Sequence, residues 1–120
     1  MNDSKQCSEA RRLIAAFGHA FEGLKAVRNH PAFRTEVLTT LVMGPLALLM
    51  GKNGVERALL IGSLMLVLVV ELLNTGIEAT IDRISTEWHS LSKFAKDVGS
   101  AAVLVSIINA SMIWFFIVLT

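Results

Sequence analysis

Apolar side chains recur at intervals of three and four residues near the beginning of the chain. Over about residues 8–28 they are Leu13, Ala16, Phe17, Ala20, Phe21, Leu24 and Val27, and polar or basic residues separate them. This period predicts an amphipathic helix. Its basic flank and two phenylalanines favour a helix lying in a membrane interface, with packing on a partner helix as the alternative.

Three long apolar segments follow and predict transmembrane helices over about residues 32–51, 56–84 and 95–119. Fifteen uncharged residues separate Glu36 from Lys52, and residues 58–77 contain one charge, Glu71. The last 23 residues of the chain contain none. Because about 20 apolar residues cross the hydrocarbon core of a bilayer, we expect an all-α integral membrane protein. The length of 120 residues leaves room for a single domain over residues 1–120.

The basic residues divide unevenly between the two sides that three spans would create. Nine lysines and arginines fall on the side of the N-terminus and of the loop between the second and third spans, against Lys52 and Arg57 on the other side. Such an excess marks the cytoplasm, so we expect a cytoplasmic N-terminus and a periplasmic C-terminus. The first ten residues lack the apolar core of a cleaved signal peptide, which predicts a retained N-terminus. The net charge of only +1 argues against a nucleic-acid partner.

Four polar side chains share one face of the second predicted span, because Glu71, Asn74, Glu78 and Asp82 are spaced three, four and four residues apart. A carboxylate inside a span costs about 2.5–3.5 kcal/mol on insertion scales, so Glu71 needs a compensating reason. One reason is structural, namely pairing with a cation or a hydrogen bond to a neighbouring helix. The alternative is a working site, in which desolvation raises the proton affinity of Glu71 and suits it to general-base catalysis. Glu78, closer to water, would supply hard carboxylate oxygen to a divalent metal.

A polar segment from Ser85 to Asp97 is predicted to connect the second and third spans. His89, Lys96 and Asp97 cluster there, although such residues are more often solvated than functional. Small residues beginning with Ser100 open the third span and allow close helix approach. The glycines at positions 18 and 23 have the spacing of a phosphate loop, but they continue as Leu24-Lys25 instead of lysine followed by serine or threonine.

Two stretches of the chain resemble the signature of bacterial diacylglycerol kinases. They are ELLNTGIEATIDR (71–83) and EWHSLSKFAKDVGSAAVL (87–104), and weaker similarity extends through AFRTE (32–36) and GLKA (23–26). The resemblance implies a small homotrimeric lipid kinase of the bacterial inner membrane, with an N-terminal amphipathic interfacial helix and three transmembrane helices. It also implies direct in-line transfer of the γ-phosphate of ATP to the hydroxyl of diacylglycerol, giving phosphatidic acid, with Mg²⁺ or another divalent metal.

The same resemblance assigns roles by position. It implies Glu71 as the general base, also in contact with the lipid, and Glu78 as a ligand of metal and nucleotide, with Asn74 and Asp82 in support. The implied nucleotide site comprises Arg12, His19, His30, Glu78, Glu87, Trp88, His89, Lys96 and Asp97. The implied lipid site comprises Ala32, Phe33, Arg34, Glu36, Glu71 and Ser100.

Two positions depart from the family pattern. The family usually has a glutamate, the second metal carboxylate, where this chain has His30, and the pairing there requires a one-residue gap. Imidazole is a poor magnesium ligand and a better one for softer metals. Either the metal preference has shifted toward a His30 and Glu78 pair, or Glu36 compensates, or activity is weak. His19 replaces the usual tyrosine beside the nucleotide base and can still stack on it.

Three other functions compete with this one. Undecaprenol kinases are related small enzymes, and nothing in the spans separates the two lipid acceptors. A small proton-coupled transporter would use one membrane glutamate to exchange protons, although such proteins usually need four spans. A non-catalytic trimeric scaffold is the third reading, suggested by His30.

Overall fold

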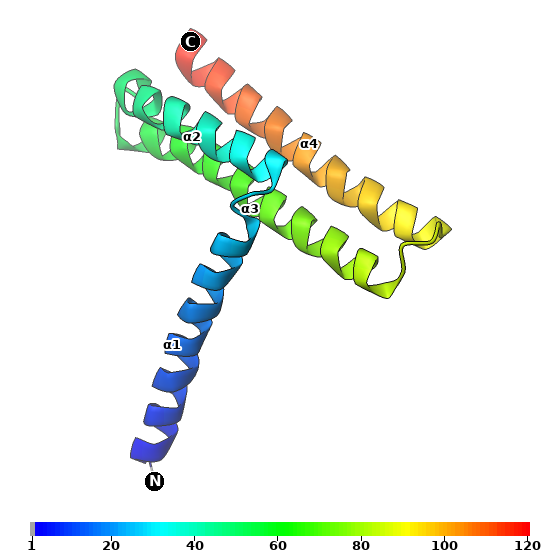
Figure 1. Ribbon diagram of the computed structural model, residues 1–120. Helices are drawn as coiled ribbons and strands as arrows, with labels where there is room; N and C mark the ends of the chain where they lie inside the picture. The colour runs from blue at the N-terminus through cyan, green and yellow to red at the C-terminus, as the bar shows by residue number, and fades with distance from the viewer. Residues whose placement is uncertain (1) are drawn as a thin grey trace. The chain divides into compact units, whose positions relative to one another are not determined.

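The computed structural model describes residues 2–120, and four helices make up most of that range (Figure 1). In chain order they are α1 (Asn2–Val27), α2 (Pro31–Met50), α3 (Gly54–Ile84) and α4 (Ser90–Leu119). The chain divides into two compact units, the first ending at His30 and the second comprising Pro31–Thr120. The sequence pattern had predicted one domain over residues 1–120.

The first unit consists of α1 and the turn that follows it. The helix begins at Asn2, ahead of the predicted start near residue 8. The additional residues include Lys5 and Gln6, which have good intrinsic helix propensity. The apolar side chains Leu13, Phe17, Phe21 and Leu24 are exposed on this helix, as an amphipathic helix in a membrane interface requires.

Local sequence signals mark where the helices of the second unit begin. Pro31 opens α2, at a position where the missing N–H of proline costs nothing. Asn53 caps α3, its Oδ1 accepting from the backbone N–H of Glu56 at 2.9 Å. His89 caps α4, its Nδ1 accepting from the backbone N–H of Leu91 at 3.1 Å. Helix α4 therefore starts at Ser90 instead of near residue 95, and residues 90–97, predicted as part of a polar connection, are helical.

Helices α3 and α4 form an antiparallel hairpin joined by residues 85–89. The buried positions of α3 alternate four and three residues apart, as in helices packed by a heptad seam; they include Leu60, Leu64, Val67, Glu71, Asn74 and Ile81. The buried positions of α4 are the small residues Gly99, Ser106 and Ala110, which let the two backbones approach closely. Trp114 donates from Nε1 to the carbonyl of Leu60 at 3.3 Å and holds the register at the far end. Helix α2 packs on α3.

Three helices of the second unit, α2, α3 and α4, are long and apolar enough to cross a membrane. Large apolar side chains such as Leu49, Leu104 and Phe116 are more than half exposed on their outer faces. This arrangement suits lipid, because lipid tails solvate apolar side chains while the helices satisfy their own backbone groups. The prediction of an all-α integral membrane protein with three spanning helices is confirmed.

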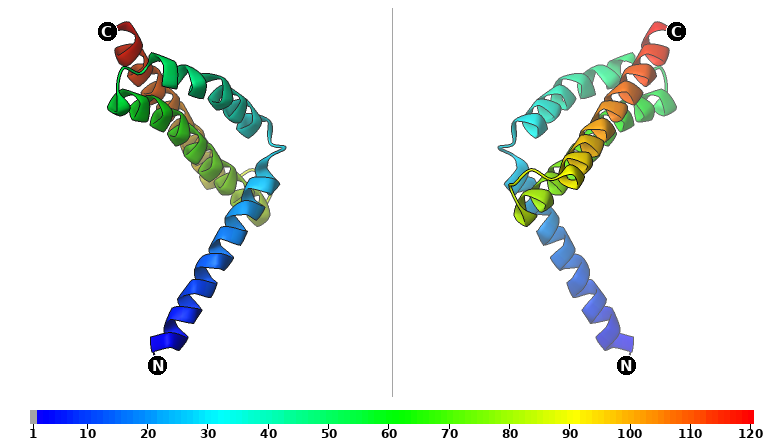
Figure 2. Two further views of the ribbon diagram at one scale, coloured as in Figure 1. Left: turned by 90° about the vertical axis from the view of Figure 1, so that its left-hand side faces the viewer. Right: turned by 90° about the vertical axis from the view of Figure 1, so that its right-hand side faces the viewer.

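The three spanning helices differ in length, so that α3 and α4 extend beyond α2 at one end of the bundle. At 1.5 Å per residue, the 20 residues of α2 rise about 30 Å and the 31 residues of α3 about 46 Å. The loop end of the α3–α4 hairpin therefore extends past the beginning of α2 (Figure 1). The α2–α3 turn and the C-terminus lie together at the opposite end (Figure 2).

Candidate functional site

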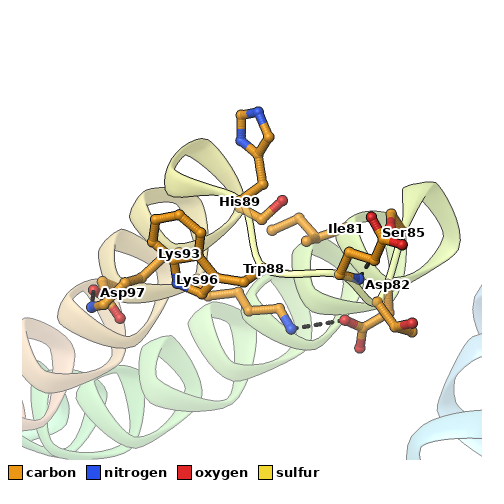
Figure 3. Close-up of a pocket in the computed structure, with 11 residues that line it drawn as sticks. Ile81, Asp82, Ser85, Trp88, His89, Lys93, Lys96 and Asp97 are labelled. Carbon is orange, nitrogen blue, oxygen red and sulfur yellow. Dashed lines mark hydrogen bonds and ion pairs between the residues drawn. The ribbon is translucent and has the colours of Figure 1, made fainter.

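A cavity of about 440 Å³ lies at the loop end of the hairpin (Figure 3). Its walls come from the last turn of α3, the connecting loop and the first two turns of α4. Six residues singled out from the sequence line it: Asp82, Glu87, Trp88, His89, Lys96 and Asp97. Five others line it that the sequence did not single out: Ile81, Ser85, Thr86, Ser92 and Lys93. The polar segment thus lines a concave, solvent-facing site.

An ion pair bridges the two helices in this cavity. Nζ of Lys96 lies 2.7 Å from Oδ1 of Asp82 (Figure 3). The side chains remain 42% and 55% exposed, so the pair contributes little to stability. A lysine held by an exposed partner can leave it for a stronger anion, because both side chains are still solvated.

A second lysine, Lys93, adds to the positive charge of the cavity. Its Nζ lies 2.5 Å from Oδ2 of Asp97, one helical turn further along α4. Sequence reasoning identified Asp97 and missed Lys93, although the spacing of four residues between opposite charges on a helix was the available signal. The cavity therefore holds two lysines, each paired with one aspartate. Such a set can accept an anionic ligand by exchanging carboxylate partners for ligand oxygens.

His89 and Trp88 border the cavity in different ways. His89 uses Nδ1 to cap α4, so Nε2 is the nitrogen left to face a ligand, and its ring points away from the Lys96–Asp82 pair (Figure 3). Trp88 is 78% exposed. An exposed indole beside two lysines offers a flat apolar surface on which a nucleotide base can stack.

The acidic side chains of α3 become less buried toward this cavity. Glu71 and Asn74 are 6% and 8% exposed, Glu78 is half-buried, and Asp82 is exposed. Asn74 donates from Nδ2 to Oε1 of Glu78 at 3.4 Å, and Thr75 donates its hydroxyl to the carbonyl of Glu71 at 2.9 Å. Glu71 and Asp82 are 11 positions apart, which is about 16 Å along the helix. The polar stripe thus connects the membrane interior with the loop-end cavity.

The residues implied for the lipid site do not gather in one cavity. Ala32 and Arg34 at the start of α2 and Ser100 on α4 are exposed, whereas Phe33 is buried. Glu36 lines a second cavity of about 290 Å³ between α2, α3 and α4, with Thr39, Thr40 and Trp114. The two threonine hydroxyls donate to Thr35 and Glu36 carbonyls of their own helix at 2.8 Å. They therefore present acceptor oxygens to the cavity, and Glu36 does not belong to the loop-end cavity.

Three residues implied for the nucleotide site belong to the first unit. Arg12 and His19 lie on α1, and His30 ends the turn after it, its backbone N–H donating to the carbonyl of Val27 at 2.9 Å. All three side chains are exposed. They are therefore accessible to a ligand.

The donor set suits a metal ion carried by a nucleotide better than a resident one. Within residues 2–120 no group of three or more histidine, cysteine, aspartate or glutamate side chains is gathered that could hold an ion. Magnesium at phosphate-transfer sites usually takes one or two carboxylates and completes its shell with phosphate oxygens and water. Glu78, half-buried and carrying one long hydrogen bond, fits such a carboxylate.

Comparison with known proteins identifies the family of this chain. Residues 18–118 match the family of prokaryotic diacylglycerol kinases. The chain is 47% identical over 104 residues to the diacylglycerol kinase of Escherichia coli K12, covering 86% of this chain and 85% of that protein. It is 46% identical over 110 residues to the diacylglycerol kinase of Pseudomonas aeruginosa, covering 91% and 89%. It is 40% identical over 103 residues to the diacylglycerol kinase of Haemophilus influenzae, covering 85% of this chain and 87% of that protein. The chain therefore belongs to the prokaryotic diacylglycerol kinase family.

Proposed function

We propose that this protein phosphorylates diacylglycerol with ATP at the cytoplasmic face of the bacterial inner membrane. The observation that carries the proposal is the continuity of two features. A solvent-facing cavity with two lysines and an exposed tryptophan receives the nucleotide, and a buried acidic stripe leads from it into the membrane, where the lipid hydroxyl lies. The names of the relatives agree with this chemistry.

In the proposed reaction the lipid hydroxyl oxygen attacks the γ-phosphorus of ATP. Glu71 accepts the hydroxyl proton, the bond from the γ-phosphorus to the β–γ bridging oxygen breaks, and ADP leaves with that electron pair. Phosphoryl transfer depends mainly on positioning and on neutralising charge on the phosphate oxygens. Lys96 supplies the neutralising charge by exchanging Asp82 for a phosphate oxygen, and Lys93 adds to it from the adjacent turn.

The remaining polar residues hold the nucleotide. Glu78 would take the divalent metal, which when bound with ATP neutralises charge on the phosphates. Trp88 stacks on the base, with Glu87, His89 and Asp97 beside it. Arg12 and His19 are candidate nucleotide contacts and His30 is the candidate second metal ligand, the roles that the family resemblance implies for them. Ala32, Arg34, Glu36 and Ser100 are candidate lipid contacts, together with Phe33, which is buried in this chain. Asn74 and Asp82 support the acidic stripe.

The proposed assembly is a homotrimer with sites shared between subunits. A single bundle of three helices could hardly enclose a lipid headgroup, a metal ion and a nucleotide together, and closed symmetric oligomers are a common way to build a larger shared site. The excess of lysine and arginine at the loop end and on α1 supports a cytoplasmic site and N-terminus and a periplasmic C-terminus.

The proposal is tested with purified protein in mixed micelles containing ATP and Mg²⁺. We expect transfer of labelled γ-phosphate to diacylglycerol. Faster transfer to undecaprenol would change the assigned acceptor while keeping the kinase chemistry. Proton-coupled dye efflux from vesicles without ATP consumption would replace it with transport, and no transfer to either lipid with magnesium, manganese or zinc would favour a scaffold.

A further inference from the structure

Gly99 of α4 lies directly against the side chain of Asn74 on α3. A Cβ atom added to Gly99 would lie 2.3 Å from Oδ1 of Asn74 and 3.3 Å from its Cγ. Three other helical glycines, Gly44, Gly62 and Gly76, would meet nothing within 4 Å. Glycine inside a helix is about 1 kcal/mol less favourable than alanine. At position 99 alanine would not fit without a shift, because the Asn74 amide occupies the space that its Cβ atom would need.

The Glu78 carboxylate leaves the Asn74 amide one favourable orientation, with its oxygen toward Gly99. Oδ1 is buried and has no hydrogen-bond partner, and the Cα–H of Gly99 that faces it offers only a weak contact. Nδ2 donates to Oε1 of Glu78 at 3.4 Å. Turning the amide over would bring its oxygen toward the carboxylate, which repels it. Gly99 thus makes the space in which Asn74 can present its NH₂ group to Glu78.

We propose that Gly99 is a positioning residue for phosphoryl transfer, acting through Asn74 on the orientation of the Glu78 carboxylate. The inference rests on the proposed function, because it assigns Gly99 to the carboxylate that receives the nucleotide-borne metal. In a pure packing role, a methyl group at position 99 would push the two helices apart. In the role proposed here, it displaces the Asn74 side chain. The nearest obstructing atom is the end of a side chain with two rotatable bonds, so alanine at position 99 turns the Asn74 amide away and leaves the helix seam in place.

The test is a double-mutant cycle between Gly99→Ala and Asn74→Ala, with Gly62→Ala as the matched glycine control. Three quantities are measured for each variant: kcat and KM for Mg-ATP, the affinity for Mg²⁺ with a non-hydrolysable ATP analogue, and the unfolding temperature in micelles. We expect Gly99→Ala to weaken Mg²⁺-dependent analogue binding about tenfold, as loss of an outer-shell partner of a metal ligand does. In the Asn74→Ala background the same change should alter binding less than about twofold, since interacting residues are non-additive.

Each other outcome has a defined meaning. An equal loss from Gly99→Ala in both backgrounds would overturn the inference, because the effect would then not pass through Asn74. A lower unfolding temperature with unchanged metal dependence would overturn it as well. If Gly99→Ala alone does not fold, the comparison of Asn74→Ala with the double variant decides, since the clash is absent there, and a tenfold difference between them overturns it. Absence of lipid phosphorylation by the wild type would reject the proposed function, while the binding cycle would still test the Gly99–Asn74–Glu78 link.

Discussion

Nζ of Lys96 lies 2.7 Å from Oδ1 of Asp82, and this pair joins the second turn of α4 to the last turn of α3 at the loop-end cavity. Because both side chains are about half exposed, the bond is easily exchanged for one to a phosphate. Replacing either residue removes the same ion pair, but only Lys96 carries a positive charge that can bind the phosphates of ATP. Its two members should therefore respond differently to substitution.

Replacing Lys96 with Met should lower kcat about 100-fold, the effect typical of removing one group that stabilises transition-state charge. Replacing Asp82 with Asn should leave kcat within a few-fold of the wild type, because Lys96 keeps its charge. Both variants lose the same ion pair, so their unfolding temperatures should be similar. Steady-state kinetics and thermal unfolding in micelles measure the two effects. Equal kinetic losses in the two variants would mean that the pair itself, and not the ammonium group, is what the reaction needs.

Replacing Glu71 with Gln should lower kcat by about 100- to 10,000-fold, the usual contribution of a general base. The KM for ATP should stay near its wild-type value, because Glu71 lies about 16 Å along α3 from Asp82 at the nucleotide cavity. Thr75, whose hydroxyl bonds the backbone carbonyl of Glu71, provides the matched control as Thr75→Ser. Undiminished turnover by the Glu71 variant would remove it from the role of base.

Replacing Ser106 with Leu should destabilise the α3–α4 hairpin by about 1–3 kcal/mol, as overpacking of a close interface does. Ser106 is 4% exposed, whereas its neighbour Val105 is 64% exposed. Val105→Leu is therefore the matched control and should leave stability nearly unchanged. Chemical unfolding of both variants in detergent micelles makes the comparison. Equal effects would show that α4 packs on α3 by another face.

Replacing His30 with Glu should lower the Mg²⁺ concentration needed for half-maximal activity, because carboxylate oxygen is a better magnesium ligand than imidazole. Wild-type protein should by comparison be activated relatively more by softer metals such as manganese or zinc. Activity titrations with each metal measure the shift, and Arg28→Gln controls for a change of charge near the same turn. An unchanged magnesium requirement would indicate that another group already serves as the second carboxylate.

The start of α4 was predicted too late in the chain, because the polarity of the segment was given more weight than the capping residue His89. His89 was identified as a nucleotide contact from the resemblance, and the segment after it was interpreted as a connection because it is polar. In the structure Nδ1 of His89 accepts from the backbone of Leu91 and starts the helix at Ser90. Polarity there reflects the extension of the hairpin beyond the start of α2, since a helix outside the hydrocarbon core need not be apolar.

Helical periodicity and apolar length were enough to predict three spanning helices, the amphipathic α1 and the alignment of Glu71, Asn74, Glu78 and Asp82 on one face. These properties follow from the rise and turn of a single helix, so nearby residues determine them. Only the packing of α3 on α4 decided that Gly99 meets Asn74 and that Lys96 pairs with Asp82. The packing of α2 against these two helices decided that Glu36 lines a separate cavity. The relative register of two helices depends on which side chains interlock across them, and no spacing within one helix specifies it.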